Sequence, residues 1–168
     1  MAEVITGGCQ CGAVRYRVET ELGNPHLCHC RMCQKAAGNY FMPLAGAARE
    51  AVVVTRGEPG WFHSSDIVRR GFCRDCGTPL FFDPLDSEHM LVTLGSLDDP
   101  AAVRPVSVYG TEARMPWIAE VCAMKGVETR IAPPSIEIKM VARIPSFMSV
   151  PPRLSAGRWR SARKASRW

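Results

Sequence analysis

The chain has 168 residues and a mass of 18.5 kDa, with 46% hydrophobic and 22% charged residues. A chain of this length can bury a core of its own, and the composition excludes collagen, a coiled coil and wholesale disorder. The formal net charge is +5, but residues 150–168 hold six basic residues and no acidic one, which leaves the rest of the chain nearly neutral. A nucleic-acid-binding body is therefore not indicated.

Signals for membrane insertion and secretion are not visible in the sequence. No run approaches the ~18 apolar residues that a membrane helix needs. Residues 1–8 have neither the basic region nor the apolar region of a signal peptide. We therefore expect a cytoplasmic protein without membrane contact, in a reducing compartment where disulfides are rare.

Short strand-like segments dominate the chain. The first is residues 13–19, where Val14, Tyr16 and Val18 alternate with charged residues. One or two helical turns are predicted for residues 31–37, and no other segment has a convincing helical period. Further strands are predicted at residues 51–55, 67–72, 79–82, 90–94 and 103–109. Together these segments predict a mostly β architecture.

The C-terminal part has a different composition. Residues 135–144 alternate in the way a late strand would, and from Pro145 onward the sequence is rich in Pro, Ser and Arg. The latter composition predicts disorder. We expect one folded domain over residues 1–148, followed by a basic, disordered tail over residues 149–168.

Cysteine is the unusual residue of this composition, with eight in the chain. Seven lie in three tight clusters, Cys9-Gln10-Cys11, Cys28-His29-Cys30-Arg31-Met32-Cys33 and Cys73-Arg74-Asp75-Cys76. Such spacing, in a chain without a visible signal peptide, favours zinc binding, with a disulfide set or an iron–sulfur cluster as the alternatives. The eighth, Cys122, stands alone between apolar residues and is expected to be a small buried hydrophobe.

The seven clustered cysteines divide naturally into four and three. The outer two clusters are pairs, which together could close a four-thiolate structural site. The middle cluster supplies three thiolates on its own and leaves a fourth position for water or substrate. The residues that could close this second site instead are His26, His29 and His63.

Thiolate metal sites carry negative charge and need donors nearby. The basic residues close to the clusters in sequence are Arg31, Lys35, Arg69, Arg70 and Arg74. A zinc ion on three thiolates is a weaker Lewis acid than one on histidines, and it suits a soft ligand such as an incoming thiol. A thiolate held there is a nucleophile toward an aldehyde, so the pattern favours thiol chemistry over hydrolysis.

Three motifs resemble a known family in their order and approximate spacing: residues 8–14 (GCQCGAV), 28–35 (CHCRMCQK) and 71–80 (GFCRDCGTPL). The family is that of the glutathione-dependent formaldehyde-activating enzymes, also called the centromere protein V domain, and the similarity covers roughly residues 3–120. The resemblance implies the Mss4-like fold, with short antiparallel strands and zinc-binding hairpins. It implies a structural zinc on Cys9, Cys11, Cys73 and Cys76. It also implies a catalytic zinc on Cys28, Cys30 and Cys33.

The activity that this resemblance implies is that of a carbon–sulfur lyase, which joins glutathione and formaldehyde to S-(hydroxymethyl)glutathione. Two zinc ions per chain and a small thiol substrate are then expected. Arg31 and Lys35 follow the triad closely enough to bind substrate carboxylates, or else they compensate the charge of the zinc site. After Trp117, itself expected in the core, the sequence departs from the family's usual closing segment.

Two other hypotheses remain at this point. The chain could be a non-catalytic zinc module that binds a protein or, through the tail at residues 150–168, a nucleic acid. It could also be a redox enzyme of the methionine sulfoxide reductase type. That chemistry would need a free nucleophilic cysteine, and only Cys122 is left over.

Overall fold

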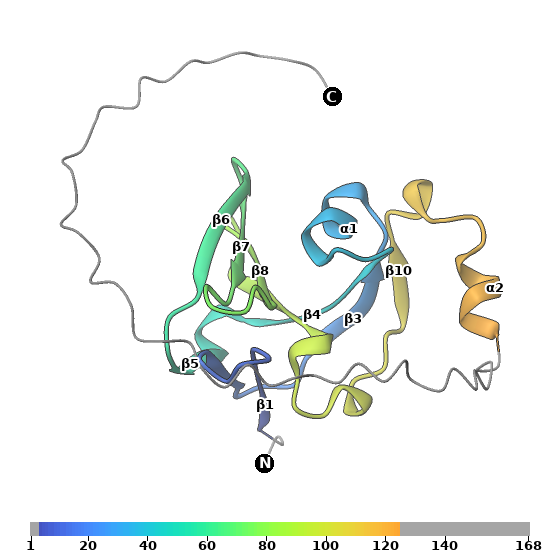
Figure 1. Ribbon diagram of the computed structural model, residues 1–168. Helices are drawn as coiled ribbons and strands as arrows, with labels where there is room; N and C mark the ends of the chain where they lie inside the picture. The colour runs from blue at the N-terminus through green and yellow to red at the C-terminus, as the bar shows by residue number, and fades with distance from the viewer. Residues whose placement is uncertain (1–3, 125–168) are drawn as a thin grey trace, which may run out of the picture. The chain divides into compact units, whose positions relative to one another are not determined.

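Two β-sheets and two short α-helices make up residues 4–124, the part of the chain that this computed structural model describes (Figure 1). The α-helices are α1 (Arg31–Ala37) and α2 (Ile118–Ala123). The strands are β1 (Ile5–Gly8), β2 (Arg15–Val18), β3 (Gly23–Cys28), β4 (Met42–Ala48), β5 (Val52–Arg56), β6 (Gly60–Ser65), β7 (Val68–Phe72), β8 (Pro79–Pro84), β9 (His89–Thr93) and β10 (Ser107–Tyr109). The mostly β architecture predicted from the sequence is confirmed.

The strands form a three-stranded sheet in the order β1-β2-β5 and a seven-stranded sheet in the order β10-β3-β4-β9-β8-β7-β6. Neighbouring strands run antiparallel except β10 and β3, which run parallel. A bridge between Gly7 and Leu97 joins the small sheet to the turn that follows β9. The two sheets are thereby held together on one side of the core.

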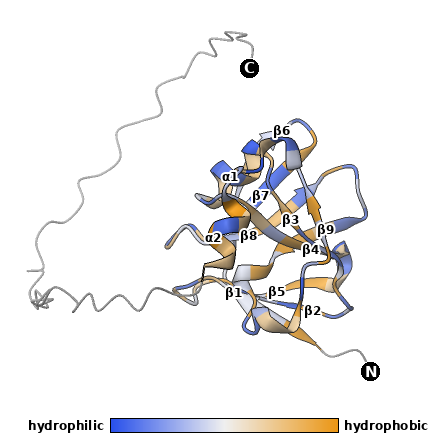
Figure 2. Ribbon diagram, turned by 90° about the vertical axis from the view of Figure 1, so that its right-hand side faces the viewer, coloured by the Kyte–Doolittle hydropathy of each residue, from blue (hydrophilic) through white to orange (hydrophobic). Residues whose placement is uncertain are grey.

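The main core contains side chains from both sheets. Val14, Tyr16 and Val18 are 2%, 1% and 0% exposed, as their alternation predicts. The Tyr16 ring meets the ring of Phe81 on β8 edge-on, with 5.1 Å between the ring centres. Figure 2 shows hydrophobic and hydrophilic residues interleaved along the ribbons, as expected for strands that bury one face.

Several elements lacked a recognisable sequence pattern. Strands β1, β3, β4 and β6 were not predicted, because small residues, Gly and Pro interrupt their alternation. The strand predicted at residues 103–109 is shorter than expected: pairing with β3 covers only Ser107–Tyr109, and Pro105 just before them has no N–H to donate. Helix α2 was also missed, because six residues with one buried side chain show no period.

Some expectations lie outside the described residues. These are the late strand at residues 135–144, the domain boundary at residue 148 and the basic tail, together with the nucleic-acid hypothesis that depends on the tail. Within residues 4–124, no helix combines the length and the apolar character that crossing a bilayer requires.

Candidate metal centres

Seven cysteines converge into two groups, in each of which the sulfur atoms lie within 4.8 Å of one another. The first group consists of Cys9, Cys11, Cys73 and Cys76. The second consists of Cys28, Cys30 and Cys33. This is the division into four and three that the spacing predicts. Among residues 4–124, no histidine nitrogen or carboxylate joins either group, so His26, His29 and His63 do not close the second one.

Two turns of the same shape supply the four-cysteine group. In the turn after β1, the N–H of Gly12 donates to the carbonyl oxygen of Cys9 at 3.0 Å. In the turn after β7, the N–H of Gly77 donates to the carbonyl oxygen of Cys73, also at 3.0 Å. Both glycines have a φ near +75°, a region that side chains disfavour. Each turn thus presents two sulfur atoms to the other.

The spacing of the sulfur atoms suits a tetrahedral metal ion. Cys11 Sγ lies 3.5 Å from Cys9 Sγ and 3.7 Å from Cys73 Sγ. Four sulfurs bound at about 2.3 Å in a tetrahedron lie roughly 3.8 Å apart. The four-cysteine group can therefore hold a metal ion with little rearrangement.

Hydrogen-bond donors surround these sulfurs, as thiolates require. The N–H of Val14 donates to Cys9 Sγ at 3.2 Å, and the Thr78 hydroxyl lies 3.1 Å from Cys76 Sγ. The hydrogen bond from Thr78 lowers the pKa of Cys76 to about 5. At Cys11 the backbone hydrogen bond from Ala13 is outweighed by the neighbouring thiols, which raise the pKa to about 12, so the environment favours deprotonation of Cys76 but not of Cys11.

The three-cysteine group forms where a strand ends and a helix begins. Cys28 is the last residue of β3, Cys30 caps α1, and Cys33 lies in the first turn of α1. The N–H of Cys33 points to Cys30 Sγ at 3.4 Å. Strand β3 is paired on both sides, with Cys28 opposite Met42 of β4 and Tyr109 of β10. The loop therefore follows a strand with a partner on each side rather than the edge strand of the sheet.

A glutamine that the sequence analysis missed fixes this loop. Gln34, which is 4% exposed, donates from Nε2 to the carbonyl oxygens of His29 at 2.7 Å and Ala113 at 2.9 Å. The N–H of His29 in turn donates to the carbonyl oxygen of Tyr109 at 2.8 Å. The sequence offered one signal for Gln34, its position directly after Cys33.

Of the arginines expected near the thiolates, Arg70 reaches them. Its Nη2 lies 3.5 Å from Cys33 Sγ. Arg69, the preceding residue of β7, instead donates to the carboxylate of Asp83 at 2.6 Å and lies over the ring of Trp61. Adjacent residues of a strand face opposite sides, which explains why only one of the two contacts the cysteines.

The three thiols of this group differ in acidity. Burial raises the pKa of Cys28 to about 12, and burial also raises the pKa of Cys33 against the opposing effect of Arg70. Burial acts on Cys30 as well, but hydrogen bonds from the Cys33 N–H and from the other two thiols outweigh it and lower the pKa of Cys30. Cys30 is therefore the thiol of the group that ionises first.

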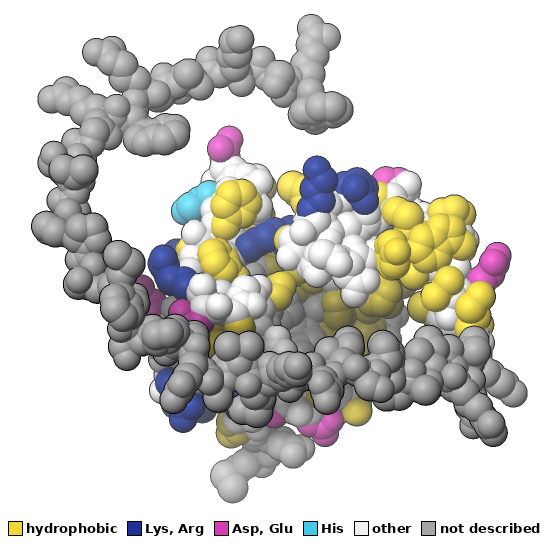
Figure 3. All heavy atoms as spheres, in the orientation of Figure 1, with side chains coloured by type: hydrophobic (Ala, Val, Ile, Leu, Met, Phe, Trp, Pro, Cys, Tyr) yellow, Lys and Arg dark blue, Asp and Glu magenta, His cyan; other side chains and the backbone are white. Residues whose placement is uncertain are grey.

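Arg31 and Lys35 lie on the exposed side of α1 and face a common pocket of about 360 Å³, which Tyr40 and Met115 also line. Figure 3 shows Lys and Arg side chains gathered over α1. The guanidinium of Arg31 also donates to the side-chain oxygen of Gln34, which links this pocket to the cysteine loop. The two basic residues therefore line one pocket, to which none of the triad cysteines contributes.

Two residues expected in the core are exposed instead. Cys122 is exposed in the last turn of α2, a helix in which Ile118 is the one buried residue. Trp117 is 38% exposed and meets the ring of Tyr40 edge-on. The hydrophobic neighbours of Cys122 in sequence therefore gave a wrong prediction, because a short edge helix buries little of its surface.

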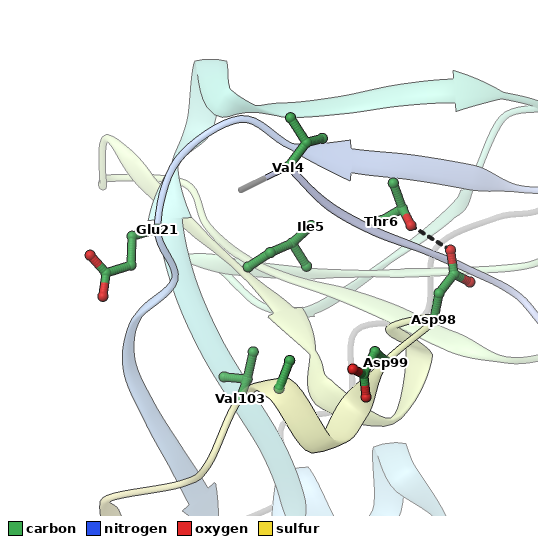
Figure 4. Close-up of a pocket in the computed structure, with 8 residues that line it drawn as sticks. Val4, Ile5, Thr6, Glu21, Asp98, Asp99 and Val103 are labelled. Atoms are coloured by element: carbon green, nitrogen blue, oxygen red, sulfur yellow. Dashed lines mark hydrogen bonds between the residues drawn. The ribbon is translucent and has the colours of Figure 1, made fainter. Parts of the chain in front are cut away.

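A separate pocket of about 440 Å³ lies near the start of the described chain (Figure 4). Its acidic wall includes Asp98, which accepts a hydrogen bond from Thr6 at 2.6 Å and pairs with Arg15. Neither cysteine nor histidine lines it. The Asp98 carboxylate is thus part of an ion pair with Arg15 of the small sheet. The cysteine groups, which carry the candidate chemistry, lie outside this pocket.

A family model described as glutathione-dependent formaldehyde-activating enzyme matches residues 4–112, which include both cysteine groups. The chain belongs to this family. The mostly β structure with its two cysteine groups agrees with the Mss4-like fold of the family, as expected from the motifs.

Individual relatives agree with this membership. A protein of Halomonas elongata, provisionally named a glutathione-dependent formaldehyde-activating enzyme, is 35% identical over 91 residues, which are 48% of this chain and 57% of that protein. A protein of Schizosaccharomyces pombe, named an uncharacterized lyase, is 30% identical over 76 residues, which are 45% of this chain and 55% of that protein. The matched segments thus span just over half of each relative.

A solved structure of a Rhodobacter sphaeroides protein shares the fold. It superposes with a TM-score of 0.51 at 24% sequence identity and covers 61% of this chain and 98% of its own. At that identity the likeness concerns the fold alone.

Proposed function

We propose that this protein is a zinc-dependent enzyme of the carbon–sulfur lyase type, which joins a small thiol such as glutathione to formaldehyde or a similar electrophile. The observation that carries the proposal is the three-cysteine group, to which no fourth Cys, His, Asp or Glu ligand comes from residues 4–124. The family and the names of the two relatives support the same reaction class.

The two groups would have different roles. Cys9, Cys11, Cys73 and Cys76 would close a structural zinc site with four protein ligands, whereas Cys28, Cys30 and Cys33 would hold the catalytic ion. A zinc ion in the second group would bind an incoming thiol and keep it deprotonated, as a nucleophile.

The chain's own residues would bind and orient the thiol. Arg31, which directly follows Cys30, and Lys35 offer two positive charges in one pocket, where the carboxylates of a peptide thiol would bind. In the overall reaction the S–H adds across the carbonyl: a carbon–sulfur bond and an O–H bond form as the S–H bond and the C=O π bond are lost. This step needs neither oxidant nor reductant.

Changing Cys30 to Ser tests the metal assignment. The wild-type chain should hold two zinc ions, and Cys30→Ser should hold one and lose the acceleration of S-(hydroxymethyl)glutathione formation over the uncatalysed rate. Metal analysis and nuclear magnetic resonance of the product measure these two quantities. The control is Cys122→Ser, which changes an exposed cysteine outside both groups and should retain both ions and full activity. A Cys30→Ser variant that kept two ions and its activity would refute the proposal.

Neutralising the basic pocket tests how the substrate binds. Arg31→Gln combined with Lys35→Gln should raise the KM for glutathione about tenfold or more, because two charge-assisted contacts are lost. The KM for 2-mercaptoethanol, which has no carboxylate, should stay the same. Equal changes for both thiols would show that these residues act on the metal site rather than on substrate carboxylates.

A further inference from the structure

Arg70 is a buried cation beside the three-cysteine group. It lies in β7 and is 7% exposed, although arginine is almost never buried so fully without a partner. The guanidinium keeps its proton at any physiological pH, so it cannot escape burial by becoming neutral. A negative charge close to it would offset the cost of its burial.

The hydrogen-bond and cation–π contacts that the structure gives the Arg70 guanidinium are with sulfur atoms and an aromatic ring. Its Nη2 lies 3.5 Å from Cys33 Sγ, its Nη1 lies 3.6 Å from Met42 Sδ, and its guanidinium carbon lies 4.8 Å from the ring centre of Phe82. A thioether and an aromatic face compensate a full charge only weakly. Among these neighbours, only the thiol of Cys33 can become an anion.

The carboxylates that form ion pairs in the described part of the chain bind arginines other than Arg70. The ion pairs within residues 4–124 are Arg15–Asp98, Arg17–Glu19, Arg49–Asp83 and Arg69–Asp83. None of them includes Arg70. Among the described residues, the ionisable side chain that Arg70 contacts is thus the thiol of Cys33.

We propose that Arg70 is the positioning residue that makes the three-cysteine site selective for an anionic sulfur ligand. This inference rests on the proposed function and names the ligand state that the site prefers. A divalent ion on three thiolates carries a formal charge of −1; a fourth thiolate makes it −2, and a neutral ligand leaves it unchanged. A fixed positive charge in contact with Cys33 stabilises the more negative state more strongly.

Arg70 also borders an internal cavity, which none of the triad cysteines lines. The residue lines a cavity of about 140 Å³ together with Ala36 of α1, Met42 of β4 and Phe81 of β8. Because Arg70 is buried, its charge acts more strongly on its neighbours than the same charge would at the surface.

Cobalt(II) binding to the full chain tests the inference, because thiolate-to-cobalt charge-transfer bands report the sulfur ligands of each site. Arg70→Met should weaken the binding of glutathione and of 2-mercaptoethanol to the cobalt in the three-cysteine site by about tenfold or more. The binding of imidazole, a neutral ligand, should change little. Arg70→Lys, which retains the charge without the planar contact, should fall in between.

The matched control is Arg69→Gln in the same strand. This variant loses a contact with Asp83 but leaves the charge beside Cys33 in place, so its thiol affinity should equal that of the wild type. Equal thiol affinity in Arg70→Met and the wild type would overturn the inference. Equal losses for thiols and imidazole in Arg70→Met would also overturn it, since they would show a merely structural role.

A second measurement uses the charge balance of the metal-free protein. Without metal no charged metal–thiolate cluster lies beside Arg70, so Arg70→Met should leave the thermal stability unchanged or raised. With metal the same substitution should lower it. A loss of stability of the same size in both states would contradict the inference.

These outcomes are separable from those of the proposed function. A wild-type protein that bound cobalt through three thiolates but failed to bind glutathione would refute the proposed substrate. The preference for 2-mercaptoethanol over imidazole, and the comparison of metal-free with metal-loaded Arg70→Met, would still decide the role of Arg70.

Discussion

At the scale of single residues, buried charges in this protein are held by named partners. Asp83 of β8 is fully buried and accepts hydrogen bonds from both Arg49 and Arg69. Arg49 also donates to the carbonyl oxygens of Pro84 and Ser87, each at 2.8 Å. One carboxylate thereby ties β7, β8 and the turn after β8 to the segment that follows β4.

Replacing Asp83 by Asn should therefore lower the free energy of unfolding by about 2 kcal/mol, measured by urea denaturation of the metal-loaded protein. The loss is smaller than for a fully buried pair because both arginine side chains are 35% exposed and can regain water. Asp86→Asn, at an exposed position two residues beyond β8, is the control and should change little. Equal stabilities of the two variants would contradict this role of Asp83.

At the scale of elements, the end of β10 touches the start of α1. Gly110 follows β10 with a φ of +66°, and a Cβ at this position would lie 2.4 Å from the backbone nitrogen of Cys30. To make room for such a Cβ, the end of β10 would have to move away from Cys30. Because β10 is paired with β3, which leads into the triad, this movement would also shift Cys28 or Cys30. The shape of the three-cysteine group thus depends on a residue 80 positions away.

Gly110→Ala should accordingly weaken metal binding in the three-cysteine group by about tenfold or more, while the four-cysteine group keeps its affinity. Titration of the metal-free chain with cobalt(II) separates the two sites. The control is Gly38→Ala at the other end of α1, where φ is also positive but no atom lies within 4 Å of the added Cβ. If both variants bound metal equally well, the close contact with Cys30 would not matter.

At the scale of the whole molecule, the four-cysteine group connects the two sheets. Cys9 and Cys11 lie between β1 and β2 of the small sheet, and Cys73 and Cys76 lie between β7 and β8 of the large one. A metal ion here joins segments that are 62 residues apart, as measured from Cys11 to Cys73. Much of the stability of the folded chain should therefore depend on this ion.

Cys76→Ser should lower the melting temperature by more than about 10 °C, because the loss of several kcal/mol of metal-linked stability corresponds to a shift of this size. Cys30→Ser should lower it less, since the triad comes from one local segment of the chain. Differential scanning calorimetry of the two variants, with their metal content measured in parallel, makes the comparison. A smaller shift for Cys76→Ser than for Cys30→Ser would reverse the structural and catalytic assignments.

The sequence by itself determined the ligand type and the grouping of the two cysteine clusters. Ligand type and close spacing are local properties, so the clusters, their division into four and three, and the helical turns after the second cluster could all be predicted. The alternation of Val14, Tyr16 and Val18 likewise identified a strand and its buried face. These features need only neighbours in the chain to be recognised.

Only the tertiary structure decided which distant groups meet. Arg70 reaches a sulfur 37 residues away while Arg69 does not, since the faces and register of strands, not their composition, direct side chains. Strands β3 and β4 have weak patterns of their own and form because each has partners on both sides. Cys122 is exposed because burial depends on what packs against a helix, which its apolar neighbours in sequence do not specify.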